Sequence, residues 1–295
     1  MELPALSSDR WPVLVTGARG LLGTALGPRL AASAPRPQDL VLTDLEDLDV
    51  TDGPAVARAV AGLPPRTILH LAAWTDVDGA ERHRDESRRV NVLGTEHAAR
   101  AAAKAGALLV LVSTDFVFDG TKDGPYTEED SVSPHSWYGR TKAEAEAAAR
   151  ALAPDHLLIR TAWLYGAGGR NFVDTILAKA RRGERLRVVA DQVGCPTWTQ
   201  DLARGLLALV QAGARGTFHV AAGGAASRRD LAEEAVRAAG LEVRVEAIRT
   251  ADLPGGIAPR PARVVLSTDK FAGTVGWRLP DWRESVRAYV APRYT

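Results

Sequence analysis

Short apolar runs alternate with helical stretches through the first half of this 295-residue chain. Parallel strands need a crossover of a dozen or more residues, and a helix is the usual crossover. The alternation therefore indicates a parallel sheet covered by helices on both faces, which is an α/β fold of the doubly wound, Rossmann type. The expected strands are Trp11–Thr16, Leu40–Thr43, Thr67–Leu71, Ala107–Ser113 and His156–Arg160, and the expected helices are Leu21–Ala32, Asp52–Gly62, Glu86–Ala105 and Trp137–Leu152.

The alternation of strand and helix breaks after Arg160. A helix at Gln200–Gln211 and a strand at Thr217–Val220 are expected to return to the large sheet. We therefore expect a Rossmann domain made of residues 1–160 and about 198–222, and a smaller C-terminal α/β lobe made of about 161–197 and 223–295. Further helices are expected at Asn171–Arg182, Arg228–Ala239 and Asp281–Val290.

Composition and charge exclude several classes of protein. The chain carries 37 Lys and Arg against 36 Asp and Glu, so it presents no overall basic field for nucleic acid. Cys195 is the only cysteine, which excludes an intrachain disulfide and a cysteine-based metal site. Met1–Pro12 lacks a basic segment followed by an apolar run, and no stretch of about 18 apolar residues occurs. We expect a cytoplasmic protein that binds neither nucleic acid nor membrane.

A glycine-rich turn follows the first expected strand and opens the first expected helix. Glycines allow close approach of the backbone, and the free N–H groups of a helix N-terminus favour the pyrophosphate of a dinucleotide. The spacing Gly-x-x-Gly-x-x-Gly is one residue longer at its first step than the usual dinucleotide fingerprint. We interpret the turn as a dinucleotide-binding site, the alternative being an ordinary glycine-rich turn. The residues involved are Gly17, Arg19, Gly20, Leu21, Leu22 and Gly23.

The sequence leaves the choice between NADPH and NADH open. Asp44 ends the second strand about 20 residues beyond the glycine turn, where a carboxylate accepts a hydrogen bond from the adenosine ribose and favours NAD. Arg19 favours NADP, because a guanidinium can bind a 2′-phosphate. Asp49 and Val50 are candidates for the wall beside the adenine, whereas Asp52 is equally a helix cap. NADPH is the expected cofactor, with NADH as the alternative.

A tyrosine and a lysine four residues apart, Tyr138 and Lys142, fall within an expected helix. They project from one face, so the ammonium is expected to bias the phenol, whose ordinary pKa is about 10, toward its ionised form. Thr114 ends the fourth strand, and its hydroxyl is expected to hydrogen-bond a substrate carbonyl while Tyr138 transfers the proton. Ser113 competes for that role, but alternation along a strand sends the two hydroxyls to opposite faces. This set predicts a nicotinamide-dependent oxidoreductase.

Several segments carry a more specific pattern, among them Ser-Thr-Asp-x-Val-Phe, Arg-Thr-x-Trp and Asp-Gln-x-Gly-x-Pro-Thr. Together with the glycine turn and Tyr-x-x-x-Lys, these segments resemble the extended short-chain dehydrogenase/reductase superfamily and, more narrowly, the dTDP-4-dehydrorhamnose reductase family. The resemblance covers nearly the whole chain. The similar segments are Val15–Gly23, His70–Asp78, Asn91, Ser113–Phe118, Tyr138–Lys142, Arg160–Gly166, Asn171–Phe172, Asp191–Thr197 and Arg260–Pro261.

The resemblance implies NAD(P)H-dependent reduction of the C4 keto group of a nucleotide-activated 6-deoxy sugar. The leading substrate is dTDP-4-dehydro-L-rhamnose, and the product is dTDP-L-rhamnose. The catalytic group implied is Thr114, Tyr138 and Lys142, with Lys142 also holding the nicotinamide ribose. Asn91 is implied to support a water-mediated proton relay beside the cofactor, the alternative being a polar residue of a helix interior. Further cofactor contacts are implied at Ala72 and Ala73.

The resemblance also implies contacts to the substrate. Arg260 is expected to bind the diphosphate, because a guanidinium binds phosphate oxygens in bidentate fashion; the alternative is a solvated loop arginine. Trp163 is expected near the sugar, the alternative being a core tryptophan. The other implied contacts are Thr75, Val77, Thr114, Asp115, Asn171 and Gln192. An aromatic-lined pocket is a further hypothesis, because three more tryptophans fall inside or beside the matched segments: Trp74, Trp137 and Trp198.

Two departures from the family pattern fall on the substrate side. Val264 stands where relatives usually have a serine, and Trp137 precedes the catalytic tyrosine in place of a smaller residue. These departures favour, as an alternative, a reductase of another nucleotide-linked keto-deoxysugar. Two alternatives from other classes are a non-catalytic NADP-binding regulatory subunit and a nucleotide-sugar isomerase that retains its cofactor. A homodimer packed through the alanine-rich helices and a Mg²⁺ requirement stay open, although no metal-ligand cluster is visible.

Overall fold

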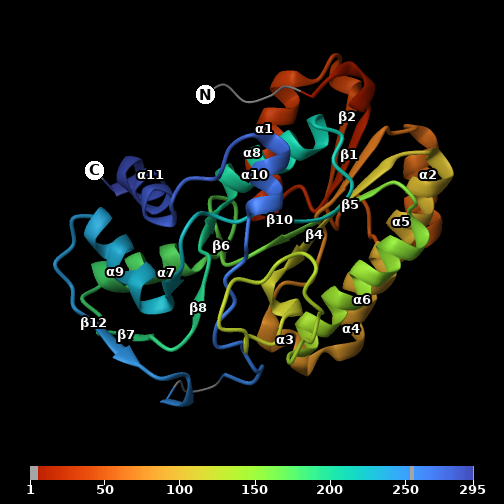
Figure 1. Ribbon diagram of the computed structural model, residues 1–295. Helices are drawn as coiled ribbons and strands as arrows, with labels where there is room; N and C mark the ends of the chain where they lie inside the picture. Colours follow the sequence, from red (N-terminus) through yellow and green to blue (C-terminus); the bar gives the residue numbers. More distant parts are fainter. Residues whose placement is uncertain (1–5, 253–255, 295) are drawn as a thin grey trace.

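A six-stranded parallel sheet forms the centre of the protein, with strand order β10-β5-β4-β3-β1-β2 (Figure 1). The computed structural model describes residues 6–252 and 256–294, so the predictions that fall on residues 1–5 lie outside the described residues. The predicted doubly wound α/β fold is confirmed. The strands are β1 (Val13–Thr16), β2 (Leu40–Thr43), β3 (Thr67–His70), β4 (Leu108–Thr114), β5 (His156–Thr161) and β10 (Gly216–His219).

Helices cover both faces of this sheet because its strands bury apolar side chains on both sides. On one face, Val13 and Val15 of β1 pack with the leucines of α1 and α8. On the other face, Leu14 packs in a cluster rich in the alanines of α5 and α6, and small side chains let these helices approach the sheet closely. The helices are α1 (Leu21–Ser33), α8 (Thr199–Gln211), α2 (Gly53–Gly62), α5 (Gly94–Ala105) and α6 (Trp137–Leu152).

A second group of elements lies apart from the large sheet (Figure 1). Its helices pack around buried aromatic and aliphatic side chains that include Tyr165 and Trp282. The strand pairs are β7 (Leu186–Val189) with β12 (Val245–Ile248), β6 (Leu164–Tyr165) with β9 (Thr197–Trp198), and β8 (Val193–Gly194) with β11 (Ala226–Ser227). The helices are α7 (Phe172–Arg181), α9 (Arg228–Ala238) and α11 (Trp282–Tyr294), while α10 (Asp269–Val275) contacts α8 and β10. The predicted domain boundaries stay a prediction.

The helix expected at Glu86–Ala105 differs from the prediction. It consists of α4 (Arg84–Arg88), a π-helical turn (Arg89–Leu93) and α5. The π turn adds a residue to the helical repeat and buries Asn91, whose side chain then bridges to other elements. Its polar partners come from segments distant in sequence, so helical periodicity alone gave no sign of the turn.

Other elements went unpredicted because they are short. Helix α3 (Val77–Arg82) has only six residues and is started by Asp76, whose Oδ1 accepts from Gly79 N at 2.9 Å. Strands β7 and β12 contain charged residues that interrupt an apolar run, and they are stabilised by pairing with each other. Among residues 6–252 and 256–294, no helix is long and apolar enough to cross a membrane.

Candidate active site

The glycine turn lies where β1 passes into α1, at the carboxyl edge of the sheet. Gly17 has a φ of +70°, and a Cβ there would meet the backbone nitrogen of Ala72 at 2.6 Å. A Cβ at Gly23 would meet the carbonyl oxygen of Ala18 at 2.4 Å. Only glycine fits both positions, because a side chain would push apart the turn and the loop after β3. Gly20 is the N-cap of α1 and provides no side-chain cap, so the first N–H groups of the helix are available to an anion.

Asp44, which favours NAD, and Arg19, which favours NADP, are hydrogen-bonded to each other. Asp44 Oδ2 accepts from the backbone nitrogen of Arg19 at 2.8 Å. The Arg19 guanidinium pairs with Glu46 at 2.5 Å and with Asp47 at 3.2 Å, and its side chain is 58% exposed. Ion pairs this exposed contribute little free energy, so an incoming phosphate could displace them. The contact with Asp44 uses only the backbone of Arg19 and does not involve its guanidinium.

The other predicted cofactor residues lie around the same edge. Leu22 and Val50 are buried, while Asp49 is exposed and accepts from Thr51 N at 2.8 Å. Asp52 caps α2, because its Oδ1 accepts from Ala55 N at 3.0 Å, which confirms the cap that the sequence allowed. Leu21, Ala72 and Ala73 are half-buried.

The predicted catalytic residues stand on two elements that are held tightly together. Thr114 ends β4, and Tyr138 and Lys142 lie in the first turns of α6. Lys142 Nζ donates to the carbonyl oxygen of Val112 at 2.8 Å. A Cβ at Gly139 would meet the carbonyl oxygen of Phe116 at 2.2 Å, so this glycine lets α6 approach the end of β4. The arrangement brings the three predicted catalytic side chains to one edge of the sheet.

The electrostatics of this group differ from the prediction. Burial raises the pKa of Tyr138 to about 12, although a hydrogen bond with Thr114 acts in the opposite direction, and the charge of Asp115 raises it further. Burial also lowers the pKa of Lys142 to about 8, against the charge of Glu146. The expectation that Lys142 biases Tyr138 toward its ionised form was therefore wrong for this arrangement. Desolvation dominates, and the ammonium points at the backbone of β4.

Asn91 connects three elements through its buried side chain. Its Oδ1 accepts from Trp74 N at 2.8 Å, and its Nδ2 donates to Thr141 Oγ1 on α6 at 2.9 Å. The amide therefore holds the loop after β3 against the catalytic helix. These bonds fit the alternative of a structural polar residue, and the role of Asn91 in a proton relay stays a prediction.

A small cavity lies beside the catalytic group. It brings together four of the predicted substrate residues, Asp115, Trp163, Gln192 and Arg260. Gln192 is buried and donates to Thr250 Oγ1 at 3.0 Å. Val264, one of the two departures from the family pattern, is 1% exposed and lines the same cavity. The complete lining is Asp115, Phe116, Trp163, Gln192, Val193, Arg228, Arg260, Pro261 and Val264.

The sequence prediction missed Arg228 in this lining. Its guanidinium carbon lies 3.5 Å from the centre of the Trp163 ring. The sequence does contain a signal for it. Ser227 and Asp230 form a capping box at the start of α9, and Arg228 is the first residue of that helix. A cation in the first turn of a helix is disfavoured by the helix dipole, so such an arginine calls for another explanation.

Other predicted substrate residues lie outside this lining. Asn171 caps α7, and its Nδ2 donates to Gly166 O at 2.9 Å, so the amide is used within the fold. Thr75 is exposed, and Val77 is the half-buried first residue of α3.

The hypothesis of an aromatic-lined pocket is supported only for Trp163. Trp198 packs in the core around Tyr289, and the Trp137 indole donates to Arg84 O at 3.0 Å. The Trp74 indole donates to Asp76 O at 3.0 Å. None of these three tryptophans lines the cavity beside the catalytic group.

The described residues hold no group of three or more His, Cys, Asp or Glu side chains arranged to bind a metal ion. Cys195 is buried, and burial raises the pKa of its thiol to about 11, which makes it a poor nucleophile. Thr114, Tyr138 and Lys142 stay the predicted catalytic residues of the site.

Comparisons with known proteins find relatives over nearly the whole chain. The model of the family described as "RmlD substrate binding domain" matches residues 11–294. A dTDP-4-dehydrorhamnose reductase of Sinorhizobium fredii is 38% identical over 288 residues, covering 94% of this chain and 95% of that protein. The crystal structure of a dTDP-4-dehydrorhamnose reductase from Clostridium acetobutylicum superposes with a TM-score of 0.90 at 38% identity, covering 94% and 98% of the two chains. That of the Bacillus anthracis enzyme in complex with NADP gives a TM-score of 0.88 at 32% identity, covering 94% and 97%.

Proposed function

Because the chain belongs to the RmlD substrate binding domain family, we propose that it reduces the C4 keto group of dTDP-4-dehydro-L-rhamnose, using NADPH. One observation carries the proposal: Thr114, Tyr138 and Lys142 meet at the carboxyl edge of the sheet, beside a glycine turn that only glycine can form. Similar reductases from Sinorhizobium fredii and Clostridium acetobutylicum match nearly the whole chain.

The residues present fit a dinucleotide. The space that a Cβ would fill at Gly17 and the uncapped N-terminus of α1 suit a pyrophosphate. Arg19 would bind a 2′-phosphate in this proposal, which favours NADPH, and the related Bacillus anthracis enzyme was crystallised with NADP. When bound, NADPH would supply the hydride for the carbon of the keto group. In this proposal Lys142 holds the nicotinamide ribose.

The protein itself supplies the proton. With its pKa raised to about 12, Tyr138 is protonated near neutral pH and can donate to the carbonyl oxygen of the substrate. Thr114 donates a hydrogen bond to the same oxygen and so stabilises the negative charge that develops on it. The reduction is balanced, because the carbon gains a hydride and the oxygen gains the phenolic proton. Tyr138 is then restored by a proton from solvent.

The proposal includes the finer calls made from the sequence. The large domain, residues 1–160 and about 198–222, would bind the cofactor, and the smaller lobe would bind the sugar nucleotide. The substrate contacts would be Asp115, Trp163, Gln192 and Arg260, which share one cavity. A homodimer, a Mg²⁺ requirement and a cytoplasmic location stay predictions.

Absorbance of reduced nicotinamide tests the proposal. The purified protein is mixed with dTDP-4-keto-6-deoxyglucose, an epimerase acting at C3 and C5, and either NADPH or NADH. We expect the wild-type protein to oxidise NADPH. The variant Tyr138→Phe should bind NADPH but not oxidise it. A folded wild-type protein that binds NADPH and oxidises neither cofactor would refute the proposal and favour another keto-deoxysugar. Val264 in the cavity is the residue to examine in that case.

A further inference from the structure

Arg228 is the one residue of the substrate cavity whose charge is left without a hydrogen-bonded partner within the described residues. Arg260, the other arginine of the lining, has its Nη2 2.7 Å from Asp78 Oδ2, and its Nη1 donates to Ala258 O. Arg228 makes neither a hydrogen bond nor an ion pair with any residue in 6–252 or 256–294. A guanidinium has five N–H donors, and Arg228 is half-buried, so these donors are available to a ligand or to water.

The guanidinium of Arg228 is nevertheless held in one place. Its central carbon lies 3.5 Å from the centre of the Trp163 ring and 5.4 Å from that of Phe172. Trp163 has a φ of +48°, the only positive φ outside glycine among the described residues. A Cβ at Gly194 would meet Trp163 Cε2 at 2.5 Å, so the indole lies directly against this glycine. Trp163 is thus a fixed platform, and stacking leaves the edge of the guanidinium free to bind a ligand.

The charges around Arg228 favour an anionic ligand. Asp115 is the only acid in the lining, and burial raises the pKa of its carboxyl to about 6, so it is largely ionised at neutral pH. Burial lowers the pKa of Arg228 only to about 10, which leaves it a cation at neutral pH. Arg260 is close enough to lower that pKa further by its charge, although Asp78 offsets the charge of Arg260. Two arginines and one acid therefore line the cavity, and Arg228 is the arginine there that has no ion-pair partner among the described residues.

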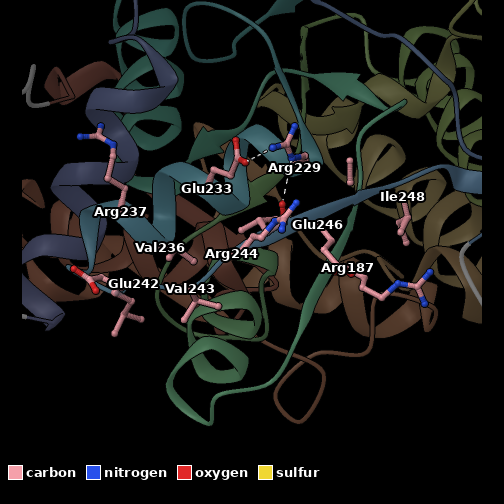
Figure 2. Close-up of a pocket in the computed structure, with 13 residues that line it drawn as sticks. Arg187, Arg229, Glu233, Val236, Arg237, Glu242, Val243, Arg244, Glu246 and Ile248 are labelled. Carbon is pink, nitrogen blue, oxygen red and sulfur yellow. Dashed lines mark hydrogen bonds and ion pairs between the residues drawn. The ribbon is translucent and has the colours of Figure 1, made fainter.

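The open groove between α9 and β12 provides a contrast. It has a volume of about 840 Å³ and is lined by several arginines (Figure 2). Figure 2 shows Arg229, the neighbour of Arg228 in sequence, pointing to Glu233, and the two are 2.6 Å apart. Glu246 in the same groove is paired with Arg185 at 2.8 Å. Arg229 and Glu246 are thus paired, whereas Arg228 has no hydrogen-bonded partner within the described residues.

We propose that Arg228, stacked on Trp163, binds the diphosphate of the sugar-nucleotide substrate and acts there together with Arg260. This inference rests on the proposed function. A guanidinium matches two phosphate oxygens at once, and the diphosphate would give the guanidinium of Arg228 a charged partner. Asp115 accepts from Thr114 Oγ1 at 3.0 Å, and the charge of Asp115 raises the pKa of Arg228. Asp115 and Arg228 line the same cavity, so this cavity connects the neighbour of Thr114 with Arg228.

Calorimetric binding of dTDP and of thymidine monophosphate tests the inference. Arg228→Met removes the charge and keeps the length of the side chain, and Arg229→Met is the matched control on the adjacent residue. We expect Arg228→Met to weaken dTDP binding about 10- to 100-fold, as for loss of a charged hydrogen-bond partner, and to change monophosphate binding far less. Arg229→Met should bind both as the wild type does. NADPH affinity and melting temperature show whether each variant is folded.

Three outcomes would overturn the inference. In the first, Arg228→Met binds dTDP within twofold of the wild-type affinity. In the second, Arg228→Met loses as much affinity for thymidine monophosphate as for dTDP. In the third, Arg229→Met loses as much affinity for dTDP as Arg228→Met does. The proposed function fails separately, if the wild type binds dTDP but oxidises no NADPH with the keto sugar. Because the Arg228 test measures binding and not turnover, the two failures are distinguishable.

Discussion

Replacing Glu146 by glutamine should destabilise the protein strongly, because this carboxylate neutralises a buried arginine. Glu146 lies one turn after Lys142 on α6 and has no exposed side-chain surface. Its oxygens accept from Arg160 Nε at 2.9 Å and from Arg160 Nη2 at 2.8 Å, and Arg150 adds a bond of 2.8 Å. Only 3% of the Arg160 side chain is exposed, so loss of the carboxylate would leave its charge buried and unpaired.

The expected loss follows from that geometry. Removing one partner of a buried ion pair costs about 3–5 kcal/mol. For a protein of this size each kcal/mol corresponds to about 2–3 °C, so the melting temperature should fall by about 6–15 °C. Burial acts to raise the pKa of Glu146, but the hydrogen bonds and charge of Arg160 outweigh it, and the net pKa is lowered. The stabilisation is therefore complete above the ordinary glutamate pKa of about 4.3 and is lost as pH falls through the lower folded-state value.

Thermal unfolding of wild type and Glu146→Gln at neutral and acidic pH measures this effect. The matched control is Glu144→Gln on the same helix, because Glu144 pairs with Arg88 in a bridge whose side chains are 42% and 54% exposed. That variant should change stability by less than about 1 kcal/mol. Glu146→Gln should also move the alkaline limb of activity to lower pH, since the charge of Glu146 raises the pKa of Lys142. A loss no larger than that of Glu144→Gln would refute the reasoning.

Three further results are expected. Gly194→Ala would place a methyl group 2.5 Å from the Trp163 indole. It should raise the KM for the sugar nucleotide several-fold and leave the NADPH affinity unchanged. Gly124 has open space around it, so Gly124→Ala should change neither quantity. Asp115→Asn should raise the melting temperature at pH 8 but not at pH 4. The folded-state pKa of about 6 exceeds the ordinary 3.8, so ionisation of Asp115 costs the folded state about 3 kcal/mol above pH 6. A lower melting temperature of the variant at pH 8 would contradict this. Arg19→Ala should lower the preference for NADPH over NADH about tenfold in the ratio of kcat/KM, and an unchanged ratio would remove Arg19 as the selector.

The large sheet could be predicted from the sequence because its strands are short apolar runs, and an apolar run is recognisable without knowing what it packs against. Leu40–Thr43 begins and ends as predicted, and so does the helix Trp137–Leu152, which Ser136 caps. Strands β7 and β12 could not be predicted, because each is ordered by the other across a long separation in sequence. The π turn at Asn91 escaped for the same reason, since its partners belong to other elements.

The candidate site shows the same limit of local patterns. The sequence placed Thr114, Tyr138 and Lys142 together because strand ends and helical spacing are local properties. The direction of the Tyr138 pKa was wrong, since burial is a property of the assembled fold. Arg228 was missed because its position is set by Trp163, a residue of another element.

The sheet edge formed by β10 has a consequence for how the protein is made. β10 pairs with β5, so residues 216–219 must leave the ribosome before the six-stranded sheet is complete. At a synthesis rate of about 5–20 residues per second, β5 waits about 3–12 s with its hydrogen-bonding edge open. An open edge strand can pair with another chain, so the nascent protein passes through a period in which it depends on protection against aggregation. Slower translation between β5 and β10 should lengthen that period.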